Sequence, residues 1–302
     1  MSRRLHSQAS WFSHSHGLPR WRRASGSAAI AVVLLVLTGC AGASPSESAP
    51  AGASHYPTAH IHGMSVDPAT NRVLLATHDG LFDVSASPAV QIGPSIDLMG
   101  FTAAAPDEFY ASGHPGPGSD LPDPVGLIRS TDGGRTWQPL SLQGESDFHA
   151  LAATHGGIVG FDGELKVTDD GTEWQAADGQ FPTHHLAGSP RGSIVLATTE
   201  KGLQRSADGG ATWATVGHAP LLVFTALSEE KAAGIGPDGR VYTSSDGGVS
   251  WVAQGSVEGE ASAIATQVID GSTQRIWVAT HDSVQVSNDH GQTFTALRSS
   301  RR

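Results

Sequence analysis

One pattern, S-x-D-x-G-x-x-W, recurs five times with small variations along this 302-residue chain. The first copy runs from Ser130 to Trp137, and the last ends in Phe294, where phenylalanine replaces the tryptophan. Successive aromatic positions lie 37, 39, 38 and 43 residues apart. A period near 40 residues, filled by short strands and turns, is typical of a β-propeller with one four-stranded blade per repeat.

The residue types of the pattern explain why it closes a turn. Aspartate and serine side chains hydrogen-bond backbone N–H groups of their own turn, and glycine adopts the positive φ of a tight hairpin. The aromatic residue three positions later returns to pack beneath the sheet, so the four tryptophans of the pattern are expected in the core. The aspartates expected to have this structural role are Asp132, Asp169, Asp208, Asp246 and Asp289.

These repeats resemble the Asp-boxes, or BNR repeats, of sialidases, related glycosyl hydrolases, sortilin-type receptors and photosystem assembly propellers. The resemblance covers most of the chain after its N-terminal segment. It implies that each box lies on the turn between the third and fourth strands of a blade, away from the usual ligand face. It implies much less about activity, because many unrelated functions share this fold.

Strand and turn signals predict an all-β protein with six blades, and seven blades are the alternative. The first unit has a degenerate box, and the second unit, which contains the first clear box, ends near Leu142. The propeller is expected to span residues 57–298, and the segment before His60 is expected to help close the ring. The six units are residues 61–85, 97–142, 147–177, 184–216, 221–255 and 261–297.

The first 39 residues have the pattern of a lipoprotein signal peptide: a basic stretch, then an apolar run too short to span a bilayer. The run ends in a sequence that resembles a bacterial lipobox, whose cysteine is lipidated; here that residue is Cys40, the only cysteine. An ordinary cleaved signal is the alternative. Residues 40–56 are then a lipidated cysteine and a flexible tether. We expect export, by the general or the twin-arginine route, and anchoring to the outer face of the cytoplasmic membrane.

The charge of the chain argues against a nucleic-acid partner. Without the first 39 residues, 13 basic and 29 acidic side chains remain, for a net formal charge near −16. No basic field is left to attract phosphates. The expected partners are therefore the membrane, through the lipid, and a small ligand, a glycan or a surface protein.

Histidines and methionines recur near the starts of first strands and the ends of second strands. In a propeller blade these two positions lie on the same face, opposite the boxes, so we expect the side chains to meet at one mouth of the central channel. Imidazole and thioether donors favour copper, with zinc also possible. The candidate metal or ligand residues are His60, His62, Met64, His78, Met99, His114, His149, His184 and His281.

Carboxylates at the same mouth leave a second function open, because glycoside hydrolysis needs a pair of acids. A Pro/Gly-rich loop, residues 113–124, adds two of them and is expected near the channel mouth. The arginine triad and Tyr/Glu pair that a sialidase would imply are not found. Whether the chain is an enzyme stays open, as does the possibility that the histidines merely line a wet channel. The candidate catalytic residues are Asp79, Asp97, Asp120, Asp123, Asp147 and Asp282.

Overall fold

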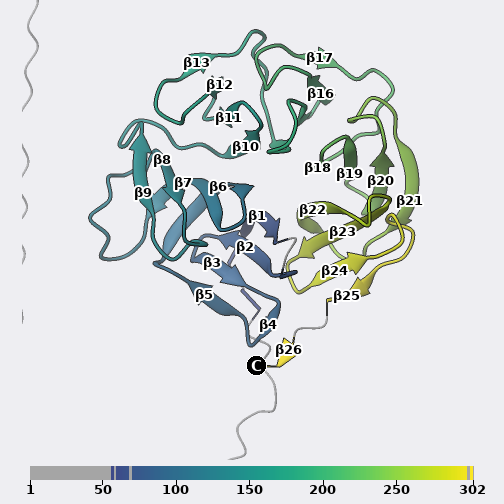
Figure 1. Ribbon diagram of the computed structural model, residues 1–302, viewed down its shortest axis with the longest axis horizontal. Helices are drawn as coiled ribbons and strands as arrows, with labels where there is room; N and C mark the ends of the chain where they lie inside the picture. Colours follow the sequence, from purple (N-terminus) through teal and green to yellow (C-terminus); the bar gives the residue numbers. More distant parts are fainter. Residues whose placement is uncertain (1–55, 58, 68–69, 298–299, 302) are drawn as a thin grey trace, which may run out of the picture. The chain divides into compact units, whose positions relative to one another are not determined.

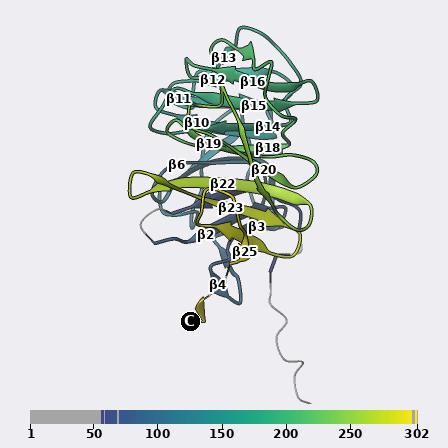
Figure 2. The ribbon, with the colours of Figure 1, turned by 90° about the vertical axis from the view of Figure 1, so that its right-hand side faces the viewer.

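Six four-stranded antiparallel sheets surround one axis in the structure, a computed structural model (Figure 1). It describes residues 56–57, 59–67, 70–297 and 300–301. Within each sheet the strands follow chain order from the axis outward, so the predicted six-bladed propeller is confirmed. Figure 2 shows the same ring from its side.

The strands of the first three blades are β1 (Ile61–Val66), β2 (Val73–Thr77), β3 (Gly80–Asp83) and β5 (Val90–Ile92); β6 (Ile96–Ala105), β7 (Glu108–Pro115), β8 (Leu127–Ser130) and β9 (Gln138–Ser141); β10 (Ala150–Thr154), β11 (Gly157–Phe161), β12 (Leu165–Thr168) and β13 (Gln175–Ala176). The strands of the last three blades are β14 (His185–Gly188), β15 (Val195–Thr199), β16 (Gly202–Ser206) and β17 (Ala214–Thr215); β18 (Phe224–Ser228), β19 (Lys231–Ile235), β20 (Arg240–Ser244) and β21 (Val252–Ser256); β22 (Ala261–Ile269), β23 (Thr273–Thr280), β24 (Val284–Ser287) and β25 (Thr295–Ala296).

Hydrophobic side chains between neighbouring blades form the core. The second strands β2 and β15 are buried along their whole length, because sheets pack against both of their faces. Six clusters of buried residues each join two adjacent blades, and one of them packs Leu75 of the first blade with Trp277 of the last. Each such side chain contributes about 1.5–3 kcal/mol when fully buried. The ring is therefore closed by core packing at all six interfaces.

The Asp-box turns are built as their residue types predict. In the first box, the Ser130 hydroxyl accepts the Gly134 N–H at 2.8 Å, and Oδ1 of Asp132 accepts the Thr136 N–H at 2.9 Å. The hydroxyl and N–H of Thr136 lower the pKa of Asp132 to about 2. Gly134 has a φ of 86°, and a Cβ there would overlap the side chain of Leu81 in the preceding blade. The same serine and aspartate bonds recur in the boxes of Asp208, Asp246 and Asp289.

The box of the third blade corrects one prediction. Its turn is one residue shorter before the glycine, and Oδ1 of Asp170, rather than Asp169, accepts the Thr172 N–H at 2.8 Å. Thr168 takes the place of the serine and accepts the Gly171 N–H at 2.9 Å. Aligning the boxes on the tryptophan assigned this role to Asp169. In the structure, the hydrogen bond between the Thr168 hydroxyl and the Gly171 N–H sets the position of the turn, and Asp170 is the aspartate that accepts.

All boxes lie on one face of the ring, away from the histidine-rich ends of the strands. In the second blade, the Gly133 N–H donates to the carbonyl of Asp107 at the turn between β6 and β7. Equivalent bonds run from Gly209 to Ser193 and from Gly247 to Glu230. Because β7 starts at this turn and runs away from it, its far end, at His114, reaches the opposite face.

Both ends of the described chain contribute to ring closure. The Tyr56 hydroxyl donates to the carbonyls of Thr280 and Ser283 in the last blade, at 3.1 and 3.2 Å. Near the C-terminus, β26 (Ser300–Arg301) pairs in parallel with β4 (Ala86–Ser87) of the first blade (Figures 1 and 2). The predicted closing role of the segment before His60 thus takes the form of a tyrosine contact.

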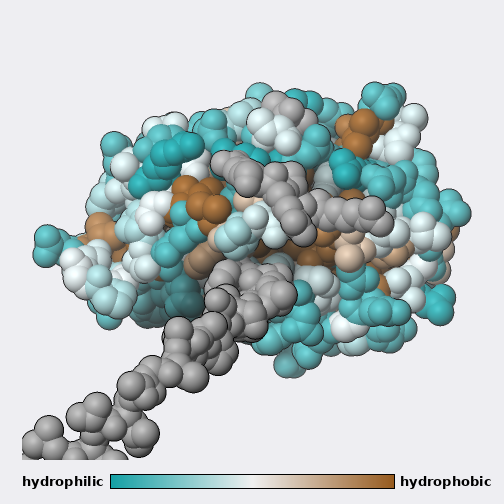
Figure 3. Space-filling view, turned by 90° about the horizontal axis from the view of Figure 1, so that it is seen from below, coloured by the Kyte–Doolittle hydropathy of each residue, from teal (hydrophilic) through white to brown (hydrophobic). Residues whose placement is uncertain are grey.

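One edge of the ring has a largely polar surface. On the edge of the ring seen in Figure 3, hydrophilic side chains predominate and hydrophobic ones show between them. No helix among the described residues is long and apolar enough to cross a membrane. The predicted signal peptide, Cys40 and nearly all of the tether lie outside the described residues.

Candidate functional site

A cavity of about 870 Å³ runs along the propeller axis and is lined by the first strands of all six blades. Small and aliphatic side chains, among them Ala150, Leu186 and Ala226, line its middle. His62, His149 and His185 line it near the starts of first strands, on the face opposite the boxes. The predicted meeting of histidines at one mouth is therefore partly realised.

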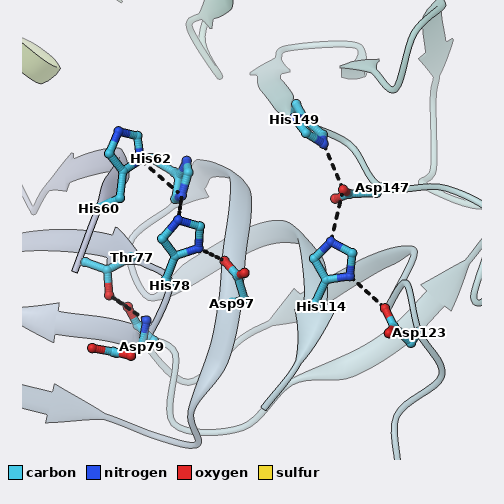
Figure 4. A network of polar contacts seen from close by, with 11 residues as sticks. His60, His62, Thr77, His78, Asp79, Asp97, His114, Asp123, Asp147 and His149 are labelled. Atoms are coloured by element: carbon cyan, nitrogen blue, oxygen red, sulfur yellow. Dashed lines mark hydrogen bonds and ion pairs between the residues drawn. The ribbon is translucent and has the colours of Figure 1, made fainter.

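Three histidines of the first blade form a compact group at this mouth (Figure 4). Nε2 of His62 lies 3.3 Å from Nε2 of His78 and 3.4 Å from Nδ1 of His60. One ring nitrogen from each residue lies within 4.8 Å of the others. The hairpin of β1 and β2 produces this arrangement, because the N–H of His78 donates to the carbonyl of His60 and holds the two strand ends together.

The local electrostatics keep His62 neutral. Burial is the main cause that lowers its pKa to about 4, and positive charge on His78, His60 or His149 lowers it further. At neutral pH the His62 ring therefore carries no positive charge that would repel a metal ion. A neutral imidazole is the form that binds a metal ion.

A carboxylate of the next blade orients the group. Oδ1 of Asp97, at the start of β6, lies 2.8 Å from Nδ1 of His78. Because an ionised carboxylate only accepts, this contact places the His78 proton on Nδ1 and leaves Nε2 with its lone pair toward His62. Metal-binding histidines commonly have such a carboxylate partner.

A second His/Asp network occupies the second and third blades (Figure 4). His114, at the end of β7, contacts Oδ1 of Asp123 through Nδ1 at 2.7 Å and Oδ2 of Asp147 through Nε2 at 3.3 Å. The same Asp147 oxygen lies 2.8 Å from Nε2 of His149. The hydrogen bond to Asp123 is the main cause that raises the pKa of His114. Asp97 and His114 are direct cross-strand partners, so the two networks adjoin.

Several predicted site residues lie apart from both networks. His281 is largely exposed, and its Nδ1 contacts Oδ1 of Asp282 at 2.8 Å. His184 precedes β14, makes no contact with either network, and lines a cavity of about 540 Å³ that Asp147 and His149 also line. Met64 lines the axial cavity and packs against the core of the first blade. Three more residues that the structure does not place in either network are Met99, Asp79 and Asp120, the last two exposed.

The predicted carboxylates are mostly paired with imidazoles. Asp97 contacts His78, Asp123 contacts His114, and Asp147 contacts two histidines. A glycosidase pair needs one acid with a raised pKa next to a second carboxylate. In this structure each of these three carboxylates has an imidazole as a partner.

His185 is a channel residue that sequence reasoning missed. It starts β14, and its Nδ1 is buried with no hydrogen-bond partner among the described residues. Burial is the main cause that lowers its pKa to about 3. The sequence did contain a signal for this position. Leu186, the next residue, is apolar and expected in the core, and side chains alternate along a strand, so residue 185 is expected on the opposite face.

Comparison with known proteins agrees with the repeat pattern. A family model described as "BNR/Asp-box repeat" matches residues 128–139, the first box. The chain is a propeller that carries BNR/Asp-box repeats. A comparison with curated proteins gave no match.

The BNR/Asp-box propeller also resembles solved structures. One of them is titled "YCF48 bound to D1 peptide"; it is 17% identical, with a TM-score of 0.44, over 67% of this chain and 68% of that one.

Proposed function

We propose that this propeller binds a copper or zinc ion through His60, His62 and His78. The observation that carries the proposal is the distance of 3.3 Å between Nε2 of His62 and Nε2 of His78. Zinc–imidazole bonds of about 2.0–2.1 Å in a tetrahedral site place two ligand nitrogens about 3.3 Å apart. The contact between His62 and His60, at 3.4 Å, has nearly the same length. Two edges of a tetrahedral site are therefore formed before any metal enters.

The protonation pattern supports the same proposal. Asp97 holds the proton of His78 on Nδ1, so the lone pair on Nε2 of His78 points toward Nε2 of His62. If Nε2 of His62 also carries its lone pair, the two repel each other until a cation lies between them. Imidazole donors suit zinc and copper, while magnesium and calcium prefer oxygen. Among the described contacts, no methionine sulfur lies with the three rings. The expected preference for copper over zinc therefore no longer has the support of a methionine ligand.

Metal titration of the purified chain, without a polyhistidine tag, tests the proposal. We expect close to one zinc or copper ion per chain by elemental analysis, and a loss of binding of at least 100-fold in His62→Ala. His281→Ala is the matched control, because this exposed histidine lies outside the group of three. Absence of binding in the native chain, or equal binding in His62→Ala, contradicts the proposal.

We also propose that the propeller is an exported lipoprotein held at the outer face of the cytoplasmic membrane. The support is the lipobox-like sequence that ends at Cys40. Labelling with radioactive palmitate in a bacterial host should mark the native chain and leave Cys40→Ala unlabelled. Equal labelling of both chains contradicts lipidation at this residue.

Glycoside hydrolysis stays a prediction. The resemblance of the repeats to those of glycosyl hydrolases supports it, and three of the candidate acids, Asp97, Asp123 and Asp147, contact imidazoles. Binding of a glycan or a surface protein at the same mouth is likewise untested. A broad glycan panel that detects neither turnover nor binding would leave the metal proposal alone.

A further inference from the structure

His114 contacts two carboxylates that belong to different walls of the cavity of about 540 Å³. Its Nδ1 lies 2.7 Å from Oδ1 of Asp123, and its Nε2 lies 3.3 Å from Oδ2 of Asp147. Asp147 lines this cavity, and so does Pro124, which follows Asp123 in the chain. Figure 4 shows the ring between the two carboxylates. His114 therefore connects the loop between β7 and β8 to the segment that leads into β10.

The two contacts together require the charged form of the His114 ring. An ionised carboxylate only accepts hydrogen bonds, so each of the two carboxylates needs an N–H from the ring. A neutral imidazole has one N–H, whereas the imidazolium has two. His114 therefore donates to Asp123 and Asp147 at the same time only when it is protonated.

The charged groups around His114 favour its protonated form. Asp123 faces it from the loop, Asp147 from the third blade, and Asp97 from β6, where Asp97 is its cross-strand partner. The hydrogen bond to Asp123 is the main cause that raises the pKa of His114, and the charges of Asp147 and Asp97 raise it further against the effect of burial. His149, the other titratable group at this point, contacts the same oxygen of Asp147 at 2.8 Å.

When His114 loses a proton, we expect the contact with Asp147 to break. This contact is the longer of the two, and Oδ2 of Asp147 still receives the N–H of His149. The neutral ring keeps its proton on Nδ1, toward Asp123, and presents the lone pair on Nε2 to the carboxylate of Asp147. The lone pair and the negatively charged oxygen repel each other.

We propose that His114 is a pH-dependent clasp between the two walls of this cavity: the imidazolium holds Asp147 to the loop of Asp123, and the neutral ring releases it. Because the folded pKa lies above the ordinary value of about 6.5, the clasp is complete below pH 6.5 and is lost as the pH rises through the pKa of His114. The cavity is thus closed in mild acid and more open at alkaline pH. None of the three proposed metal ligands takes part in this clasp.

Nitrogen-15 NMR of the full chain, labelled at histidine, tests the protonation states. Below pH 6.5 both ring nitrogens of His114 should be protonated, and above the titration midpoint only Nδ1 should keep its proton. Asp123→Asn and Asp147→Asn should each lower this midpoint. A midpoint below that of a free histidine in the native chain, or one that neither variant moves, contradicts the clasp.

Hydrogen exchange tests whether the wall that carries Asp147 moves. The N–H of the next residue, Phe148, donates to the hydroxyl of Ser112 on β7 at 3.0 Å. We expect its protection, relative to an unstructured peptide at the same pH, to fall about 10-fold between pH 5.5 and pH 8.5. The Gly144 N–H donates to the carbonyl of Pro124 at 2.8 Å and should keep its protection, because the contact with Asp123 remains.

His114→Gln removes the titration, because a glutamine side chain carries no charge at any pH. Protection at Phe148 should then be low at both pH values. His281→Gln is the matched control, since it removes an exposed histidine that an aspartate holds at 2.8 Å, and it should keep the 10-fold change. His149→Gln should keep the change as well. If the change persists in His114→Gln, or disappears in His149→Gln, the clasp proposal is wrong, whatever the outcome of the metal titration.

Discussion

Asp97 and His78 belong to different blades and are joined by a contact of 2.8 Å between Oδ1 and Nδ1. The aspartate is the second residue of β6, and the histidine follows β2. The contact sets which nitrogen of His78 faces the other two rings. A side chain of the second blade therefore orders a group that lies wholly in the first.

Asp97→Asn should weaken metal binding about 10–100-fold, the usual cost of losing the carboxylate partner of a metal-binding histidine. An asparagine amide can donate as well as accept, so it no longer requires the His78 proton to be on Nδ1. Nε2 of His78 is then no longer held in the form that has a free lone pair. A competition titration with a chromophoric chelator measures the change. Asp282→Asn is the control, since Asp282 contacts the exposed His281, which lies outside the group of three; an equal loss in both variants contradicts the assigned role.

Ser244→Ala should lower the free energy of unfolding by about 1–3 kcal/mol, because it leaves a buried N–H without a partner. The buried Ser244 hydroxyl accepts the Gly248 N–H at 2.9 Å and contacts Oδ1 of Asp246 at 2.7 Å. Urea unfolding followed by tryptophan fluorescence measures the change. Ser272→Ala, at an exposed turn, should leave the unfolding midpoint unchanged.

Thr225→Val should leave the free energy of unfolding unchanged or raise it by about 1 kcal/mol, because a buried hydroxyl without a partner costs stability. Oγ1 of Thr225 is buried with no hydrogen-bond partner among the described residues. Thr198→Val is the comparison, since the Thr198 hydroxyl donates to the carbonyl of Val223 at 2.8 Å. This second variant should be destabilised, and the opposite order of the two midpoints contradicts the structural assignment.

His185 should make the protein sensitive to acid. Its pKa is about 3 in the folded chain, mainly because of burial, against about 6.5 when exposed. Below pH 6.5 the unfolded chain therefore binds a proton that the folded chain does not, and stability falls as the pH falls toward 3. One such group changes the free energy of unfolding by roughly 1.4 kcal/mol per pH unit in this range.

Urea midpoints at pH 7.0, 5.5 and 4.5 test this prediction with His185→Gln. The variant should lose less stability than the native chain between the first and last pH. His218→Gln, a change at an exposed histidine, is the control. Parallel pH profiles for the native chain and His185→Gln would rule out the effect.

The spacing of the boxes predicted the fold because each copy specifies the same hairpin and the period fixes one blade per copy. The directions of the first and second strands within each blade then predicted the mouth of the channel at which His62, His78 and His149 lie. The pairing of Asp97 with His78 was not predictable, since it joins side chains of two blades whose directions only packing decides. His184 was expected in the channel where His185 lies, because a shift of one residue moves a strand side chain to the other face.

The box turns and the three-histidine group occupy opposite faces of the ring, and this separation has an evolutionary consequence. The hydrogen bonds from Gly133, Gly209 and Gly247 hold three of the box hairpins at the box face. Substitutions at the other face, including the loop between β7 and β8, leave those bonds untouched. Relatives of this chain are thus free to keep the hairpins and exchange the mouth residues for new chemistry.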